Sequence, residues 1–247
     1  MKIKGLVDYS QPIVAAATVL SVGMVIAVGL ASYSAYKVKM AANTIEMTGS
    51  AKETVMADFA RWTIMLNAKT PIDNQQFGFD ILEKATDKIT AYLQGQGFND
   101  METPAPTIWP EYVYPEKSAP LLTGYSVSRQ IIVRSSDIDA IQKLTGNISP
   151  LSGPSYNVST GNLELTYQDL PQMRIKLLSE AIKDARARAE AIAKETGRKV
   201  GTLKSAVGGV VQVLPQGGID ISDYGSYDTQ SKNKDIMVTV RASFIIK

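Results

Sequence analysis

The sequence predicts an α+β fold, in which one N-terminal transmembrane helix precedes an exported domain of mixed, largely antiparallel sheets with two long helices and one short helix. Three observations lead to this prediction. An uncharged apolar stretch lies near the N-terminus. Segments with helical and with strand periodicity then interleave along the chain. Several neighbouring strands are joined by loops too short for crossover connections, which favours antiparallel pairing.

The first element is the uncharged stretch from Tyr9 to Tyr36, whose centre, Ile13 to Ala31, is nearly all Val, Ala, Leu, Ile, Met and Gly. A hydrocarbon core of ~30 Å requires about 20 apolar residues in a helix. A soluble domain does not leave such a helix apolar on every face. We therefore expect a short cytoplasmic tail at residues 1–11, a transmembrane helix at 12–36 and a linker at 37–44.

A cleaved signal peptide is the alternative interpretation of this stretch. Lys2 and Lys4 precede the apolar block, and Ser32-Tyr33-Ser34 fits a small-x-small cleavage pattern. The length favours a retained anchor, because the apolar regions of signal peptides run about 7 to 15 residues. The lysines on the two sides of the helix nearly balance, so the positive-inside rule does not decide orientation. A short N-terminal tail that stays inside, with the domain outside, is the simplest arrangement.

The first half of the domain alternates between strand and helix patterns. Val55 to Ala68 alternates in polarity and predicts a strand. From Phe79 to Gly95 apolar residues recur at three and four positions, which predicts an amphipathic helix with a glycine exit. Met101 to Trp109 is expected to be extended, and Tyr125 to Val133 alternates as a further strand. The loop expected between these two segments contains Pro110, Pro115 and Pro120.

The second half continues in the same way. Ser136 to Leu144 predicts the short helix, and Tyr156 to Tyr167 returns to strand character. Val200 to Val213 is a further strand region, and Ile236 to Ile246 alternates without a break. The last strand is therefore expected to be integral to a sheet.

The second long helix lies between these strands. Asp169 is expected to cap it, Pro171 is tolerated in its first turn, and the helix is expected to end near Glu195. Small residues at positions 181, 185 and 189 would permit close approach to a sheet. On the exposed face we expect ion pairs between residues four apart, Asp184 with Arg188 and Glu190 with Lys194.

Composition excludes several classes of function. The 247-residue chain has a net charge of +2, so it has no strong field for nucleic acid, and we expect no nucleic-acid partner. It has no cysteine and no histidine, which removes disulfides, thiol catalysis, and the commonest general base and metal ligand. We predict no catalytic, cofactor-binding or metal-binding residues, and we do not expect an enzyme.

Two loops could still carry contacts. The first displays Trp109, Tyr112 and Tyr114, whose rigid aromatic rings suit an interface with a neighbouring subunit. The alternative is a hairpin whose aromatic rings fold back on their own sheet. The second loop, residues 217–227, places Asp220 and Asp223 near Asp228. These carboxylates could attract Ca²⁺, although their spacing is not that of an EF-hand, and a solvated loop is the simpler interpretation.

Several short motifs, taken in order, resemble the SIMPL-domain family. The long helix from Ala181, followed by Gly197 and Gly201, resembles the C-terminal signature of that family. The resemblance covers residues 45–247, as one α+β domain or as two subdomains at about 45–134 and 135–247. The other segments that carry it are Thr48-Gly49-Ser50-Ala51, Gly95-x-Gly97, Pro110-Glu111-Tyr112 and Thr123-Gly124-Tyr125.

The resemblance implies a bacterial cell-envelope protein, periplasmic or membrane-associated, with no established enzymatic activity. Members are linked to oxidative-stress defence, and some resemble ring-forming or channel-like homo-oligomers. This chain departs from many members because it carries a full-length apolar helix. We therefore expect a single-pass inner-membrane protein that assembles into a homo-oligomeric, ring-like or channel-like scaffold with its domain in the periplasm. The alternative is a monomeric envelope binding module that captures a ligand or a partner protein.

Overall fold

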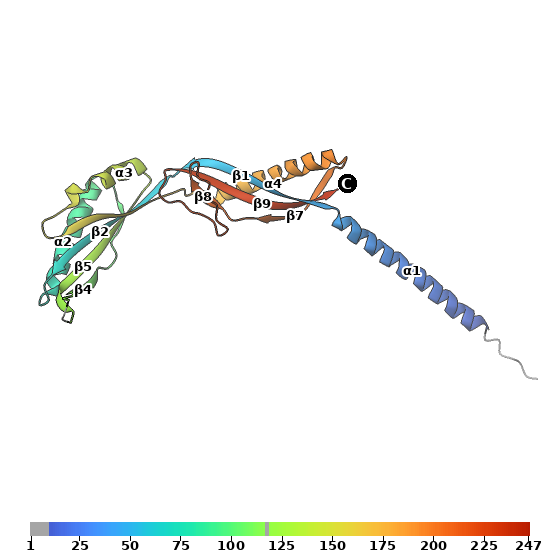
Figure 1. The fold of residues 1–247 in the computed structure, drawn as a ribbon, viewed down its shortest axis with the longest axis horizontal. Helices are drawn as coiled ribbons and strands as arrows, with labels where there is room; N and C mark the ends of the chain where they lie inside the picture. The colour runs from blue at the N-terminus through green and yellow to red at the C-terminus, as the bar shows by residue number, and fades with distance from the viewer. Residues whose placement is uncertain (1–9, 117–118) are drawn as a thin grey trace, which may run out of the picture. The chain divides into compact units, whose positions relative to one another are not determined.

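The computed structural model describes residues 10–116 and 119–247 (Figure 1). The chain forms two compact units, and each is built from segments that are far apart in the sequence. The first unit contains the chain up to Ser50 together with Ala181–Gly208 and Val240–Lys247. The second contains Ala51–Glu180 and Gly209–Thr239. The predicted α+β class with antiparallel sheets is confirmed.

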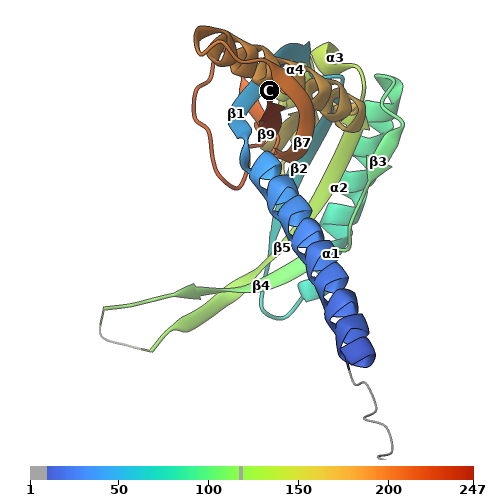
Figure 2. The same ribbon diagram turned by 90° about the vertical axis from the view of Figure 1, so that its right-hand side faces the viewer.

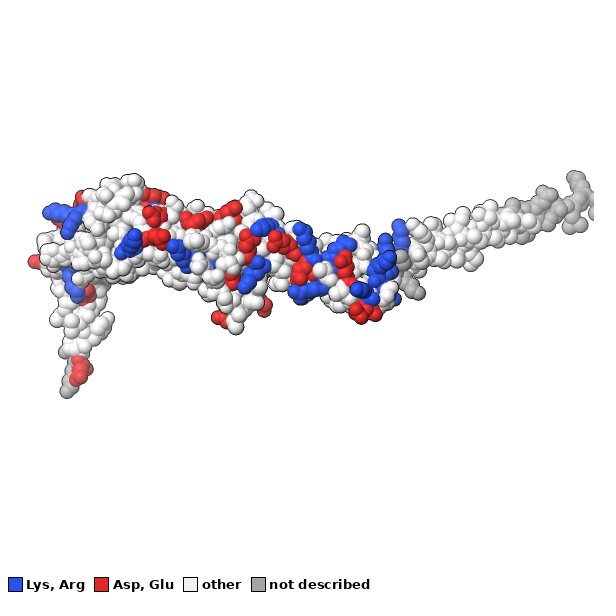
Figure 3. Space-filling view, turned by 90° about the horizontal axis from the view of Figure 1, so that it is seen from above, with Lys and Arg blue, Asp and Glu red and all other residues white. Residues whose placement is uncertain are grey.

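The apolar stretch forms one helix, α1 (Ser10–Ala42). Its segment Ala16–Lys37 is long and apolar enough to cross a membrane, and none of that segment is buried against the protein. Figure 3 shows this helix without charged side chains over most of its length. By length and composition it would also suit a signal sequence. The helix continues through Ala42 into the segment predicted as a linker, and the predicted tail lies, up to residue 9, outside the described residues.

The second unit contains a five-stranded antiparallel sheet. Its central strands are β2 and β5, which pair over eleven residue pairs from Ala60 with Ser135 to Thr70 with Tyr125. β6 lies beside β2, while β3 and β4 both pair with β5. The strands are β2 (Phe59–Thr70), β3 (Asp100–Glu102), β4 (Thr107–Val113), β5 (Leu121–Ser135) and β6 (Asn157–Thr166).

Two helices and a short 3-10 turn (Ser149–Leu151) pack with this sheet, and the longer helix covers one of its faces (Figure 2). α2 (Gln75–Gly95) buries Leu82, Ile89 and Leu93 against the sheet, and α3 (Ile138–Gly146) adds Ile138 and Ile141. β2 supplies Trp62, Ile64 and Leu66, all fully buried, because its side chains alternate between the two faces. Asn74 caps α2 by accepting from the Phe77 N–H at 3.1 Å, and Asp137 caps α3.

A second sheet has the strand order β1-β9-β7, with β8 also paired to β9. The long helix α4 (Leu170–Glu195) buries Leu177 and then every fourth residue, Ala181, Ala185, Ala189 and Ala193. A Cβ on Gly49 of β1 would lie 2.1 Å from the Ala181 carbonyl oxygen, so strand and helix meet at backbone distance. The strands are β1 (Thr44–Met56), β7 (Val200–Gly208), β8 (Gln212–Pro215) and β9 (Asn233–Ile246).

The strand predicted over Val55 to Ala68 is wrong in one respect, because two strands meet there. β1 ends at Met56 and β2 begins at Phe59. Between them the Ala57 N–H donates to the Lys232 carbonyl at 2.8 Å, and the Asp58 N–H donates to the Thr166 carbonyl at 3.0 Å. Met56 is exposed, whereas Ala60 and Trp62, which a single strand would place on the same side as Met56, are buried. The sides of the alternation therefore exchange between the two strands.

Pro110 lies within β4, not in a loop as the sequence predicts. It is opposite Tyr125 of β5, and β4 pairs with β5 alone. The missing N–H is tolerated because β4 is an edge strand, whose outer side needs no ladder donor.

The ion pairs of α4 match the prediction in part. Arg188 Nε lies 2.9 Å from Asp184 Oδ2, as expected. The same carboxylate accepts from the Ser50 N–H at 2.9 Å, and this backbone bond, followed by Arg188, lowers the pKa of Asp184. Glu190 pairs with Arg186 at 2.9 Å and not with Lys194, so that predicted pair is wrong.

Candidate functional site

The hairpin formed by β4 and β5 extends beyond the rest of its sheet (Figure 2). β2 pairs with β5 only as far as Tyr125, whereas β4 pairs with β5 as far as Leu121. The segment from Leu121 to Gly124 therefore has a single neighbouring strand. Two-stranded ribbons are marginally stable in water, so this outer part of the hairpin gains little from its own sheet.

Apolar side chains concentrate on this outer part and at its base, where Trp109 lies opposite Ser126. Trp109 is 64% exposed and Tyr114 is 74% exposed, and Tyr112 is also exposed. The rings of Tyr112 and Tyr114 lie 6.4 Å apart between centroids and tilt by 52°. The exposed Val113 and Leu121 lie on the outer part. We call residues 109–114 and 121–124 together the aromatic hairpin.

The aromatic hairpin therefore leaves all three predicted interface residues in solvent. Exposed apolar clusters of this kind mark contact surfaces more often than isolated apolar residues do. Its charge is low at the base, where Lys69 Nζ neutralises Glu111 Oε2 at 2.9 Å. That these aromatic residues contact another subunit stays a prediction.

A second apolar surface lies in the loop of residues 217–227, and the sequence reasoning missed it. Ile219 and Ile221 are exposed, and Tyr224 is 96% exposed. The signal in the sequence was weak, because the three residues are spaced irregularly among Gly, Ser and Asp. We call these three residues the apolar loop. It belongs to the same unit as the aromatic hairpin.

The acidic residues near this loop do not gather into a metal site. Asp220 and Asp223 are exposed, whereas Asp228 accepts from Lys234 Nζ at 3.2 Å. Burial raises the pKa of Asp228, but hydrogen bonds from the Gln230 N–H and from Lys234 outweigh it, so its pKa is lowered. Within residues 10–116 and 119–247, no group of three or more acidic side chains is arranged to hold a metal ion.

Two adjacent buried charges in β9 were not found from the sequence. The Lys234 side chain is fully buried and donates to the Asp228 carbonyl at 2.6 Å. The Asp235 carboxylate accepts from Thr54 Oγ1 at 2.6 Å, from Lys52 Nζ at 3.0 Å and from the Gly217 N–H at 3.0 Å. These bonds fix both ends of the segment that carries the apolar loop, so their role is to position it.

Two charged residues near the start of β2, Asp58 and Arg61, form their contacts within the second unit. Asp58 Oδ1 accepts from the Gln168 N–H at 2.9 Å. Arg61 pairs across the sheet with Glu164 at 3.3 Å. Both interactions join neighbouring segments of the same chain.

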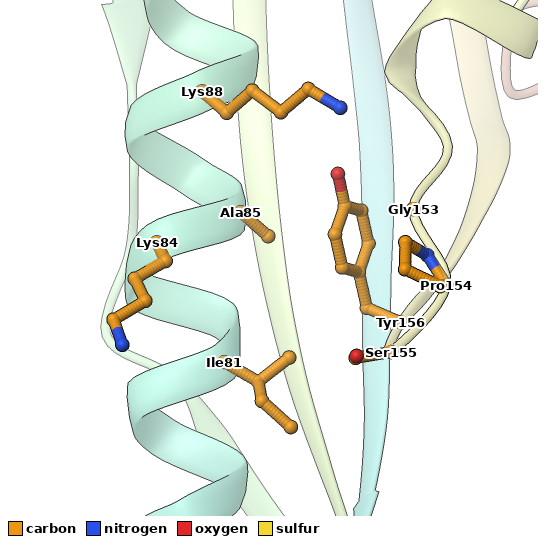
Figure 4. Close-up of a pocket in the computed structure, with 8 residues that line it drawn as sticks. All are labelled: Ile81, Lys84, Ala85, Lys88, Gly153, Pro154, Ser155 and Tyr156. Atoms are coloured by element: carbon orange, nitrogen blue, oxygen red, sulfur yellow. The ribbon is translucent and has the colours of Figure 1, made fainter.

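A shallow groove of about 280 Å³ lies between α2 and the segment before β6 (Figure 4). The Lys88 ammonium and the Tyr156 hydroxyl point into it, whereas Lys84 points away from Tyr156. The Tyr156 hydroxyl donates to the Leu151 carbonyl at 3.1 Å, and Lys88 lies 3.5 Å from the Ser152 carbonyl. The Lys88 cation beside apolar walls suits a small anionic ligand, but the groove supplies no nucleophile and base pair for catalysis.

The similarity to a known protein family extends over nearly the whole domain. The model of the SIMPL family, described as a protein of unknown function (DUF541), matches residues 45–244. No curated protein matches the chain. The matched region includes the aromatic hairpin, the apolar loop and the buried charges of β9.

Proposed function

Since the chain belongs to the SIMPL family, whose function is unknown, we propose that it is a membrane-anchored envelope protein that assembles with copies of itself through the aromatic hairpin. The observation that carries the proposal is the exposure of Trp109, Tyr112 and Tyr114 on a hairpin whose outer part has no third strand. Burial of large aromatic side chains dominates the energy of most interfaces. Stabilising the outer hairpin would be a further gain on assembly.

A ring or channel is the form that we propose for the assembly. A head-to-tail contact joins two different surfaces, and it closes into a ring when the rotation between copies permits. Each copy offers two such surfaces, the aromatic hairpin and the apolar loop. Insertion of the aromatic hairpin of one copy against the apolar loop of the next would cover both.

Assembly is tested with a double variant, Trp109→Ser with Tyr114→Ser. By light scattering of the full chain in detergent, we expect an oligomer for the wild type and a monomer for the variant, because two anchors worth about 2 kcal/mol each are lost. The matched control is Ile175→Ser on α4, whose 63% exposure is close to the 64% of Trp109, and it should leave the oligomer intact. A wild-type monomer at all accessible concentrations would contradict the proposal.

Cross-linking in membranes tests the same contact without detergent. The chain has no cysteine, so a disulfide between single-cysteine variants reports a contact between copies. Co-expressed Tyr114→Cys and Ile221→Cys chains should form a mixed dimer if the contact is head-to-tail. A disulfide only between two Tyr114→Cys chains would indicate a symmetric hairpin contact, and a closed ring through this contact would then be excluded.

Anchoring through α1 is the second part of the proposal, with the domain outside the cytoplasm. It is supported by the length and composition of Ala16–Lys37 and by Lys37 lying 5.0 Å above the Tyr33 ring. Tyrosine and lysine are common at membrane interfaces. The intact mass of protein extracted from membranes should include α1. A mature chain that begins near Ser34 would show that the helix is a cleaved signal. Release of the protein from membranes without detergent would support the same conclusion.

The groove beside Lys88 favours a second candidate, a monomeric envelope module that binds a small anionic ligand. The ammonium of Lys88 would hold such a ligand. A monomer by light scattering, together with absence of the cross-links, would favour this function over assembly. The link to stress defence rests on the family resemblance alone and is kept as an expectation.

A further inference from the structure

The strands of the first unit bring three parts of the chain together where α1 ends. One residue beyond α1, the Asn43 carbonyl accepts from the Ile246 N–H at 3.0 Å. Lys247 and Lys199 then exchange two backbone hydrogen bonds, each 2.9 Å long. The turn between α4 and β7 is thereby held at the end of the sheet from which the helix leaves.

This end of the unit must lie close to the membrane surface if α1 spans the bilayer. The apolar segment ends at Lys37, and Asn43 is six residues further along the chain. At 1.5 Å per helical residue, the Asn43 pairing lies within about 9 Å of the end of the apolar segment. The inference therefore rests on the anchoring part of the proposed function.

The turn between α4 and β7 carries basic residues that line a hollow in the surface. Gly197 adopts a φ of +69°, and the Arg198 N–H returns to the Ala193 carbonyl at 2.8 Å, which ends α4. The turn sets Arg198 and Lys199 beside Lys194 of the last helical turn. Together with Glu190, Gly197 and Val200, these three cations line a hollow of about 430 Å³.

The charge of this hollow is not neutralised by the protein. Its one carboxylate, Glu190, is already paired with Arg186. Among the residues that the structure describes, Lys194, Arg198 and Lys199 form no salt bridge with an acidic side chain, and all three are exposed. Figure 3 shows several Lys and Arg side chains at the end of the domain that joins α1, with Asp and Glu side chains among them.

We propose that this hollow binds the phosphate group of anionic phospholipids in the leaflet next to the domain. Guanidinium and ammonium groups bind phosphate through charge-assisted hydrogen bonds. Basic residues close to an anionic leaflet each add a favourable interaction that falls off within a Debye length. A lysine at a helix end is common because it complements the helix dipole, but that role does not explain Arg198 and Lys199, which follow the helix. Lipid contact here would restrain the domain against the membrane surface.

Lipid titration of the purified full chain tests this proposal. In detergent, native mass spectrometry should show preferential retention of phosphatidylglycerol over phosphatidylcholine by the wild type. The triple variant Lys194→Gln, Arg198→Gln, Lys199→Gln should lose about tenfold or more of this preference. Two control variants should keep the preference for phosphatidylglycerol. Lys84→Gln with Lys88→Gln removes two cations of the second unit. Lys37→Gln removes the cation at the end of the apolar segment of α1, and so tests whether that lysine rather than the hollow is responsible. An unchanged preference in the triple variant would overturn the proposal, as would no preference in the wild type.

A second arm separates lipid from soluble phosphate. Hydrogen exchange of the peptide around residues 194–200 should slow when phosphatidylglycerol is added, and millimolar inorganic phosphate alone should not produce the same effect. Equal protection by inorganic phosphate would overturn the lipid assignment and identify a soluble phosphate site. Light scattering and intact mass of the same samples report on assembly and on retention of α1, so failure of the proposed function can be distinguished from failure of the lipid site.

Discussion

A Gly49→Ala variant is expected to destabilise the first unit by about 3 kcal/mol, although it adds only one methyl group. The added Cβ would lie 2.1 Å from the Ala181 carbonyl oxygen, 2.4 Å from the Ala185 nitrogen and 2.8 Å from the Ala185 Cβ. Two of these atoms belong to the helix backbone, so no side-chain rotation relieves the clash. α4 must move away from β1 as a body.

Movement of the helix would also break a polar contact. The Ser50 N–H donates to Asp184 Oδ2 at 2.9 Å, directly beside Gly49. A gain of about 0.4–1 kcal/mol from the lower chain entropy of alanine in the unfolded state does not offset these losses. The expected effect is therefore large and local.

Hydrogen exchange of the full chain in detergent is the appropriate measurement. Both tryptophans, Trp62 and Trp109, belong to the second unit and would not report on the first. Amides of α4 from Ala181 to Glu195 should lose protection in Gly49→Ala. The control is Gly95→Ala at the end of α2, where a Cβ meets nothing within 4 Å, and where we expect a change below about 1 kcal/mol. Wild-type exchange of α4 in Gly49→Ala would contradict the close approach of strand and helix.

The same contact shows what the sequence could predict of the fold and what it could not. Alternation predicted β9, because five of its apolar side chains are buried on one face: Ile236, Val238, Val240, Ala242 and Phe244. β1, which pairs with β9, has Gly49 as its one buried residue among partly and fully exposed ones. It offers no apolar period from which its bounds could be predicted. The small residues of α4 did predict a close approach, but not the strand that makes it.

The break between β1 and β2 could not be predicted from the local sequence pattern either. Ala57 is buried against the second-unit core, so apolar character continues across the gap. What ends each strand is a pair of backbone bonds to Lys232 and Thr166. These partners are more than 100 residues away in the sequence, and a local pattern carries no information about them.

For the candidate surfaces, too, local residue chemistry could be read from the sequence, but long-range strand pairing could not. The aromatic side chains of Trp109, Tyr112 and Tyr114 could be recognised as contact residues from their chemistry and their Pro-rich setting. That Tyr112 and Tyr114 lie beyond the end of β2 depends on how β2, β4 and β5 are aligned, which is a property of register. The basic hollow depends on the pairing of Lys199 with Lys247, and therefore could not be predicted from the short run Arg198-Lys199 alone.

The buried carboxylate of Asp235 is expected to make the free energy of unfolding depend on pH in the acid range. The side chain is 1% exposed. Hydrogen bonds from Thr54, from the Gly217 N–H and from Lys52 lower the pKa of Asp235 from 3.8 to about 2. Because the folded-state pKa lies below that of the unfolded chain, the resulting stabilisation is fully present above about pH 4. It is lost as the pH falls through about 2, and amounts to about 2 kcal/mol.

An Asp235→Asn variant should therefore lose about 2–4 kcal/mol at neutral pH, since an amide nitrogen would face donors that now meet a carboxylate oxygen. Denaturant unfolding followed by tryptophan fluorescence reports on this unit, because Trp62 and Trp109 both belong to it. The difference between wild type and variant should shrink by about 2 kcal/mol between pH 5 and pH 2. Asp220→Asn, which changes an exposed carboxylate of the same segment, should show neither effect. A pH-independent difference would show that the carboxylate is not held ionised by these three donors.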